Sequence, residues 1–355
     1  MIMPLQLADR AYLARFLSHR AGEAHQGEHW LLAGELPGPT LPQVLAEAKQ
    51  QGANYVLLGV PEDLGPRANL GRGGATDAWH AFLGQFANLQ SNPFLGGEQI
   101  LLLGEIRTDA LQQQAHGLSS DTPQQLATLR QLTEQLDALL KPVIAQVVAA
   151  GLEPIVIGGG HNNAYPILAG ASEAIDGPLS AVNLDPHSDF RATEGRHSGN
   201  GFAYAHEQGA LDYYHVLGLH ELKNNSASLT ALQESDKRWT SYQAIWVRRE
   251  LSLAQALERI SDDLHLAGRP LGVELDLDAV AGLASSAETV AGIPLTDALH
   301  SVFHLAKHHP CAYLHLAEGA PACHPAGVDA GRRQIGQALS ELVFSYLSGR
   351  LSAIH

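Results

Sequence analysis

The sequence has 355 residues, of which 45% are hydrophobic and 17% charged, and its formal net charge is −15 at pH 7. This surplus of acidic residues argues against binding to nucleic acid or to an anionic membrane, and no stretch rich in Lys and Arg offsets it. No apolar run approaches a membrane-spanning length, and residues 1–6 lack the features of a signal peptide, so we expect a cytoplasmic protein. The two cysteines, Cys311 and Cys323, lack zinc spacing and are expected to be buried free thiols.

Short apolar runs alternate with longer helical patterns along the chain, which indicates an α/β fold with a parallel sheet covered on both faces. The clearest helix is capped by Asp121 or Thr122, has Pro123 in its first turn and stops at Gly151. Other helices are expected after Asn163, at 252–267, 295–308 and 332–347. About eight strands are expected, at residues 55–59, 100–103, 154–157, 181–184, 214–217, 244–247, 271–275 and 312–316.

No linker or internal repeat divides the chain. We therefore expect a single domain over residues 1–355, with a three-layer α/β/α architecture and an N-terminal helical extension over about residues 1–50. The glycines at 195, 199 and 201 indicate a permissive loop between strands, which we interpret as part of a functional site.

Side chains suited to divalent cations occur in three short segments, each just after an expected buried strand. Residues two apart in an extended chain project to one face, so Asp185, His187 and Asp189 point the same way, as do Asp276 and Asp278. Taken singly, each pattern could equally be a solvated loop or a helix cap. Taken together, four carboxylates and two imidazoles predict a site for two hard cations, Mn²⁺ rather than structural Zn²⁺, that share a bridging water. The predicted metal ligands are His161, Asp185, His187, Asp189, Asp276 and Asp278.

The order of these motifs, followed by a Glu before a Pro in residues 318–321, resembles the ureohydrolases, the family of arginase, agmatinase and formimidoylglutamase. Residues 59–63 and 69–75 are similar to the N-terminal signature of that family, so the resemblance extends over roughly residues 54–348. Residues 158–161, 189–191 and 197–202 look most like the formimidoylglutamase branch. The resemblance implies an arginase-like fold, a small-molecule substrate and a homo-oligomer.

The resemblance also implies a role for each site residue. One ion would take His161, Asp185, Asp189 and Asp276, and the other His187, Asp185, Asp276 and Asp278. The implied reaction is attack of the shared water on an amidine or guanidine carbon, in which Asp189 orients the water and Glu318 anchors the amidinium. His197 would shuttle a proton to the leaving nitrogen.

Arg191 and Asn200 are the implied substrate-binding residues. Because a guanidinium suits a carboxylate, Arg191 favours N-formimino-L-glutamate as the substrate, with glutamate and formamide as products.

Plainer interpretations remain open at this stage. Glu318 could cap a loop, Arg191 could be solvated or ion-paired, and His197 is one of 19 histidines. The chain also departs from the wider family pattern around the expected ligands. These departures put arginase activity in doubt more than metal binding, and they leave open a catalytically silent family member with a weak metal site. A guanidino-compound hydrolase that releases urea is the other alternative. The departures are Gly160, Asn162, Pro186, Glu274, Ala281 and Gly282.

Overall fold

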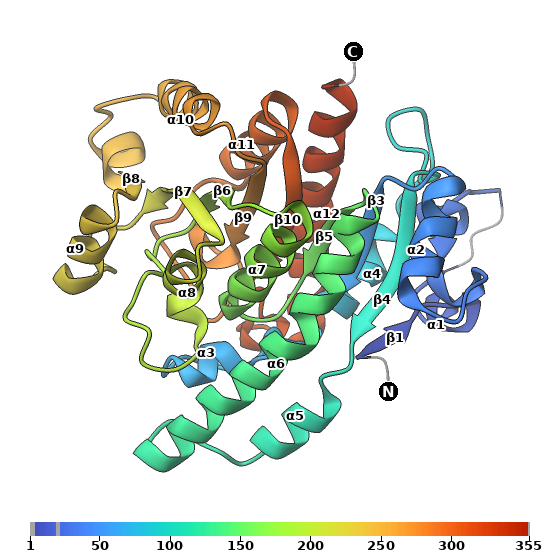
Figure 1. Ribbon diagram of the computed structural model, residues 1–355, viewed down its shortest axis with the longest axis horizontal. Coiled ribbons are helices and arrows are strands. Elements are labelled where there is room, and N and C mark those ends of the chain that lie inside the picture. Colours follow the sequence, from blue (N-terminus) through green and yellow to red (C-terminus); the bar gives the residue numbers. More distant parts are fainter. Residues whose placement is uncertain (1–3, 19–21, 354–355) are drawn as a thin grey trace.

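The computed structural model describes residues 4–18 and 22–353, and this part of the chain is built around one sheet of ten strands (Figure 1). The strands are β1 Leu5–Leu7, β2 Leu31–Leu32, β3 Tyr55–Gly59, β4 Ile100–Ile106, β5 Glu153–Ile157, β6 Leu179–Leu184, β7 Leu211–Leu219, β8 Arg238–Ser241, β9 Leu271–Asp276 and β10 Cys311–Ala317. Their order is β1-β4-β3-β5-β10-β9-β6-β7-β8, and β2 also pairs with β4. Only β1 is antiparallel to its neighbour among these strands.

Helices cover both faces of the sheet and complete three layers. The α-helices are α1 Arg10–Ala14, α2 Leu41–Gln50, α3 Leu64–Ala68, α4 Ala78–Phe86, α5 Asp109–Ala115, α6 Pro123–Ala149, α7 Ala164–Ile175, α8 Gly201–Glu207, α9 Ser226–Glu234, α10 Leu253–Ala267, α11 Leu295–His308 and α12 Val328–Ser352. One apolar layer contains residues of α2, α6, α7 and α8, and the other contains residues of α4, α10, α11 and α12. In the described part of the chain, no helix has both the length and the apolar character needed to cross a membrane.

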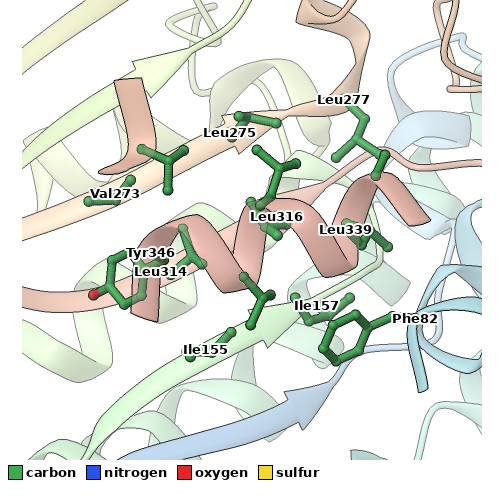
Figure 2. Packing of buried hydrophobic residues seen from close by; sticks show 14 of the residues in the cluster. Phe82, Ile155, Ile157, Val273, Leu275, Leu277, Leu314, Leu316, Leu339 and Tyr346 are labelled. Carbon is green, nitrogen blue, oxygen red and sulfur yellow. The ribbon is translucent and has the colours of Figure 1, made fainter. Parts of the chain in front are cut away.

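The packing of α12 shows how the core holds the central strands in place. Leu339 and Tyr346 pack among side chains from β5, β9 and β10 (Figure 2), and both are at most 1% exposed. Every residue of β6 and β9 is buried, as expected of strands covered on both faces. Each fully buried Leu, Ile or Val side chain contributes about 1.5–3 kcal/mol to folding. The central strands are therefore firmly packed, and polar groups at their ends are held in fixed positions.

The predicted α/β/α fold is confirmed, and seven of the expected strands are present. Helix α11 has the predicted bounds. Helix α6 begins after Thr122, whose side chain accepts a hydrogen bond from the backbone N of Gln125. Helix α12 is longer at both ends than predicted.

Three expectations are wrong in detail. Residues 244–247 form a π-helix, Gln243–Val247, and the strand lies just before them as β8. A short apolar run does not distinguish a strand from a buried helical segment. The N-terminal region is not only helical, because β1 and β2 join the sheet at β4, although residues 1–3 lie outside the described chain. Cys311 and Cys323 are free but only partly buried.

Candidate metal centre

Four polar side chains follow four neighbouring strands of the sheet. His161 lies in a short turn after β5, Asp185 directly follows β6, Asp276 is the last residue of β9, and Glu318 directly follows β10. These strands are adjacent in the order β5-β10-β9-β6 and run parallel to one another. Because ligands of open parallel sheets collect beyond the carboxyl ends of the strands, this edge is the expected position of a site.

The turn that carries His161 is held by a buried glutamate from the N-terminal signature. Glu62 Oε1 accepts hydrogen bonds from Gly160 N at 2.6 Å and Asn163 Nδ2 at 2.8 Å. Gly159 has φ 74, and a Cβ there would lie 2.6 Å from Glu62 Oε1, so that this position requires glycine. Burial raises the pKa of Glu62 to about 7. Glu62 of the upstream signature therefore supports the turn that carries His161.

We define the inner ligand set as His161, Asp185, Asp189 and Asp276, whose ligand atoms lie within 4.8 Å of one another. The Nδ1 atom of His161 is 3.1 Å from Asp185 Oδ2, 3.0 Å from Asp189 Oδ2 and 3.4 Å from Asp276 Oδ2. Oxygen and nitrogen ligands bound at about 2.1 Å to one octahedral cation are separated by about 3 Å when adjacent. The inner set therefore has the spacing that a small divalent cation requires.

We define the outer ligand set as His187, Asp276 and Asp278, together with Asp185. Ligand atoms of the first three lie within 4.8 Å of one another, and His187 Nδ1 is 3.4 Å from Asp185 Oδ1. Asp278 is oriented by the backbone, since its Oδ1 accepts a hydrogen bond from Ala287 N at 2.9 Å. Asp185 and Asp276 thus contribute to both sets, as two bridging carboxylates would.

The electrostatics of the cluster also suit cations. Burial, followed by the charge of Asp185, raises the pKa of Asp189 to about 6. Burial and the charges of Asp278 and Asp185 raise the pKa of Asp276 well above its usual value. Burial would lower the pKa of His187, but its hydrogen bond to Asp185 and that residue's charge raise the pKa to about 9. Crowded carboxylates that hold protons to reduce their repulsion bind divalent cations in exchange for those protons.

Two residues of the site have a strained backbone. Asp189 has φ 45 and Glu318 has φ 64, a region that costs non-glycine residues on the order of 1 kcal/mol each. Glu318 is 2% exposed, and its Oε1 accepts a hydrogen bond from His161 N at 2.7 Å. Its Oε2 has no hydrogen-bond partner among the described residues. One carboxylate oxygen of Glu318 is therefore left to bind a ligand in the adjoining cavity.

A cavity of about 150 Å³ adjoins the two ligand sets. Its buried wall includes Asp189, Asp276 and Glu318, and its more exposed wall carries two cations, Arg191 and Lys223. The guanidinium of Arg191 has no hydrogen bond or ion pair with any described residue. Lys223 Nζ donates to Thr289 Oγ1 and has no carboxylate partner in the same part of the chain. The cavity therefore joins an anionic, ligand-rich end to a cationic end.

Sequence reasoning missed Lys223. It lies in the loop after β7, which is the neighbour of β6 in the sheet. The signal that could have identified it is its position just past a predicted parallel strand, the same signal that marked the aspartates.

Two predicted site residues are not brought to the cavity. His197 is 1% exposed, its Nδ1 accepts a hydrogen bond from Gly199 N, and burial lowers its pKa to about 3. The Asn200 amide is used within the loop, accepting from Arg196 Nη1 and donating to Ala192 O and Gly195 O. Neither residue lines the cavity. Their observed contacts are structural, and they shape the loop that carries Arg191.

Gly160 and Asn162, two of the departures from the family pattern, are held by close contacts. Both residues lie in the turn held by Glu62, and the Asn162 side chain packs against Gly65, where a Cβ would be 1.8 Å from Asn162 Oδ1. Asn162 O accepts a hydrogen bond from Arg196 Nη2 at 2.7 Å. These neighbours hold the backbone around His161 in place.

The fold and the site together define an α/β protein with a carboxylate-rich candidate metal centre at the carboxyl edge of its sheet. The chain belongs to the arginase family, whose model matches residues 53–341. It is similar to formimidoylglutamase of Streptococcus pyogenes serotype M3, with 31% identity over 185 residues, which is 49% of each chain. The match thus spans about half the length of this curated relative.

Solved structures resemble the chain over most of its length. Formimidoylglutamase from Bacillus subtilis superimposes with a TM-score of 0.72 at 15% identity, covering 94% of each chain. A Trypanosoma cruzi formiminoglutamase with Mn²⁺ gives a TM-score of 0.65 at 20% identity, covering 86% of this chain and 97% of that one. At these identities the likeness establishes the arginase-like fold.

Proposed function

We propose that the protein is a binuclear manganese hydrolase of linear amidines, and that it converts N-formimino-L-glutamate to glutamate and formamide. The observation that carries this proposal is the cavity, which joins two overlapping metal-ligand sets to a cationic end. The names of similar proteins support the substrate, since the S. pyogenes and B. subtilis relatives are formimidoylglutamases. The Mn²⁺ in the T. cruzi structure supports the choice of metal.

His161 and the aspartates of the inner set would hold one Mn²⁺, and His187 with the outer set would hold the other. When bound, the two ions supply Lewis acidity that activates a water molecule for attack on the amidine carbon. Asp189 is suited to orient that water, because it lines the cavity and its carboxylate is part of the inner set.

Glu318 is suited to bind the amidinium. The four aspartates offset the charge of two divalent cations, which leaves Glu318 as the anionic group facing a cationic substrate end. Its unpartnered Oε2 can accept a charge-assisted hydrogen bond from an amidinium N–H. This role uses the buried end of the cavity.

Arg191 and Lys223 are suited to bind the other end of the substrate. Two cations without carboxylate partners match a substrate with two carboxylates, which N-formimino-L-glutamate has. Arginine and agmatine lack a side-chain carboxylate and would leave at least one of these cations unpaired. The cavity therefore favours an acidic amidine over a guanidino compound.

A substrate panel tests the proposed reaction. Protein supplemented with Mn²⁺ is incubated with N-formimino-L-glutamate, arginine and agmatine, and both formamide and urea are measured. We expect formamide from the first compound and no urea from the others. Release of urea, or no product from any compound with Mn²⁺ bound, would refute the proposed substrate or the enzymatic function.

Substitutions at the cationic end test the substrate class separately. Arg191→Ala and Lys223→Ala should each lower kcat/KM for N-formimino-L-glutamate by about tenfold to a hundredfold, because each removes one charge-assisted contact. An amidine lacking both carboxylates should react equally with all variants. Arg259→Ala removes an exposed cation of α10 and is the matched control. It should leave kcat/KM unchanged for both substrates.

We also propose a cytoplasmic homo-oligomer without a nucleic-acid partner. The family resemblance supports the oligomer, and the net charge of −15 argues against a polyanionic partner. Size-exclusion chromatography with light scattering measures the assembly, and a monomer at micromolar concentration would refute it.

A further inference from the structure

Glu274 is a buried carboxylate in direct contact with the inner ligand His161. It belongs to β9, is fully buried, and stands opposite His315 of the neighbouring parallel strand β10. Its Oε2 lies 3.3 Å from His161 Nε2 and 2.6 Å from His315 Nδ1. Its Oε1 accepts a hydrogen bond from Tyr313 OH at 2.7 Å. Side chains from β10 and from the turn after β5 therefore converge on one carboxylate behind the ligand.

These contacts indicate which nitrogen of His161 carries the ring proton. A carboxylate oxygen accepts hydrogen bonds, and Glu274 Oε2 faces His161 Nε2, so that the proton of His161 belongs on Nε2. The lone pair of His161 Nδ1 then faces Asp185, Asp189 and Asp276, where the inner ion would bind.

We propose that Glu274, held by His315 and Tyr313, is a positioning residue that fixes the ring orientation and tautomer of His161 and thereby strengthens binding of the inner metal ion. This inference rests on the proposed metal centre. A carboxylate that accepts from the second nitrogen of a metal-bound histidine makes that ligand more basic and restricts its rotation. The outer ligand His187 has Asp185 as its only carboxylate partner among the described residues, on the side of the metal. Glu274 therefore acts on one of the two ions.

Manganese titration of the apoprotein followed by calorimetry tests the inference. Glu274→Gln keeps the shape of the side chain and removes its charge, and we expect the inner Mn²⁺ to bind about tenfold to a hundredfold more weakly. The affinity for the outer Mn²⁺ should change less. Glu153→Gln is the matched control, because Glu153 is ion-paired with Arg350 at the opposite end of β5, and its Mn²⁺ affinities should equal those of the unmodified protein.

The tautomer provides a second readout that a purely structural role would not change. In ¹⁵N-histidine-labelled, metal-loaded protein, the Nε2 proton of His161 should be present, and in Glu274→Gln its signal should shift or broaden. If Glu274→Gln does not fold, Tyr313→Phe replaces it, with an expected weakening of about threefold to tenfold after loss of one donor to Glu274.

The outcomes separate this inference from the proposed function. If the unmodified protein binds no Mn²⁺, the metal centre and the role of Glu274 both fail. If it binds two ions, and the variant binds the inner one within threefold of the same affinity with an unchanged His161 signal, only the role of Glu274 is refuted.

Discussion

The two halves of the candidate metal centre differ in how their histidines are held. The side chain of His161 is 0% exposed, and both of its ring nitrogens face carboxylates, Nδ1 toward the inner ligand set and Nε2 toward Glu274. The side chain of His187 is 28% exposed and borders the cavity. The difference indicates that the core orients the inner ligand before any metal binds, whereas the outer ligand is free to adjust to its ion.

The shared ligands should give the largest effect, because they belong to both halves. Asp185→Ala or Asp276→Ala removes a bridging carboxylate, and we expect kcat to fall on the order of 10³-fold or more with loss of bound Mn²⁺. Steady-state kinetics and elemental analysis measure the two quantities. Asp262→Ala replaces an exposed aspartate of α10 and is the control. It should leave kcat and the content of bound Mn²⁺ unchanged. Full activity with normal metal content in either bridging variant would remove the basis for two overlapping ligand sets.

Replacing the histidine of each half should lower the free energy of unfolding by different amounts. His161→Ala leaves a cavity in the core and takes a donor from buried Glu274, so we expect metal-free protein to lose about 2–4 kcal/mol of unfolding free energy. His187→Ala should cost about 1 kcal/mol or less, because its side chain is partly exposed. Urea denaturation of both apoproteins compares them. Equal losses would mean that the core does not hold His161 more firmly than His187.

The metal-free centre should make stability depend on pH. The pKa of Asp189 is raised from 3.8 to about 6, so its contribution to stability is present below pH 3.8 and is lost as pH rises through 6. The pKa of His187 is raised from 6.5 to about 9, and its contribution is lost as pH rises from 6.5 through 9. Both signs agree, so between pH 5 and 8 these two residues should lower Tm of the chelator-treated protein by a few degrees relative to Tm of the metal-loaded protein. Buried histidines outside the ligand sets, such as His197, change both forms alike.

Bound Mn²⁺ replaces these protons, so the metal-loaded protein should show little or no such fall over the same range. Differential scanning calorimetry of both forms provides the comparison. A difference in Tm between the two forms that does not widen from pH 5 to 8 would contradict the electrostatic account of the cluster.

The sequence predicted that the candidate ligands lie together, because their signal is local. Polar residues spaced by two, directly after apolar runs that form parallel strands, can only meet at one edge of the sheet. The strand β8 was misplaced for the opposite reason. It is a short edge strand with polar residues, whereas the apolar run after it forms a helix.

The partners of individual side chains were not predictable from the sequence, because they depend on contacts between distant strands. Asn200 and His197 are turned into their own loop by hydrogen bonds with Arg196 and Gly199. Glu274 was noted only as a departure from the family pattern, and its role emerges from its register with His315 on β10. Lys223 follows a predicted strand, but its place in this cavity depends on the order of β6 and β7 in the sheet.

The most direct test of the account is a titration of the apoprotein with Mn²⁺ in which bound metal and formamide release from N-formimino-L-glutamate are measured together. The account predicts two bound ions per chain, little formamide with the first equivalent, and a rise in rate that follows the second, because the outer ligands complete the centre beside the cavity. Full turnover with one equivalent, or two bound ions without formamide, would contradict it.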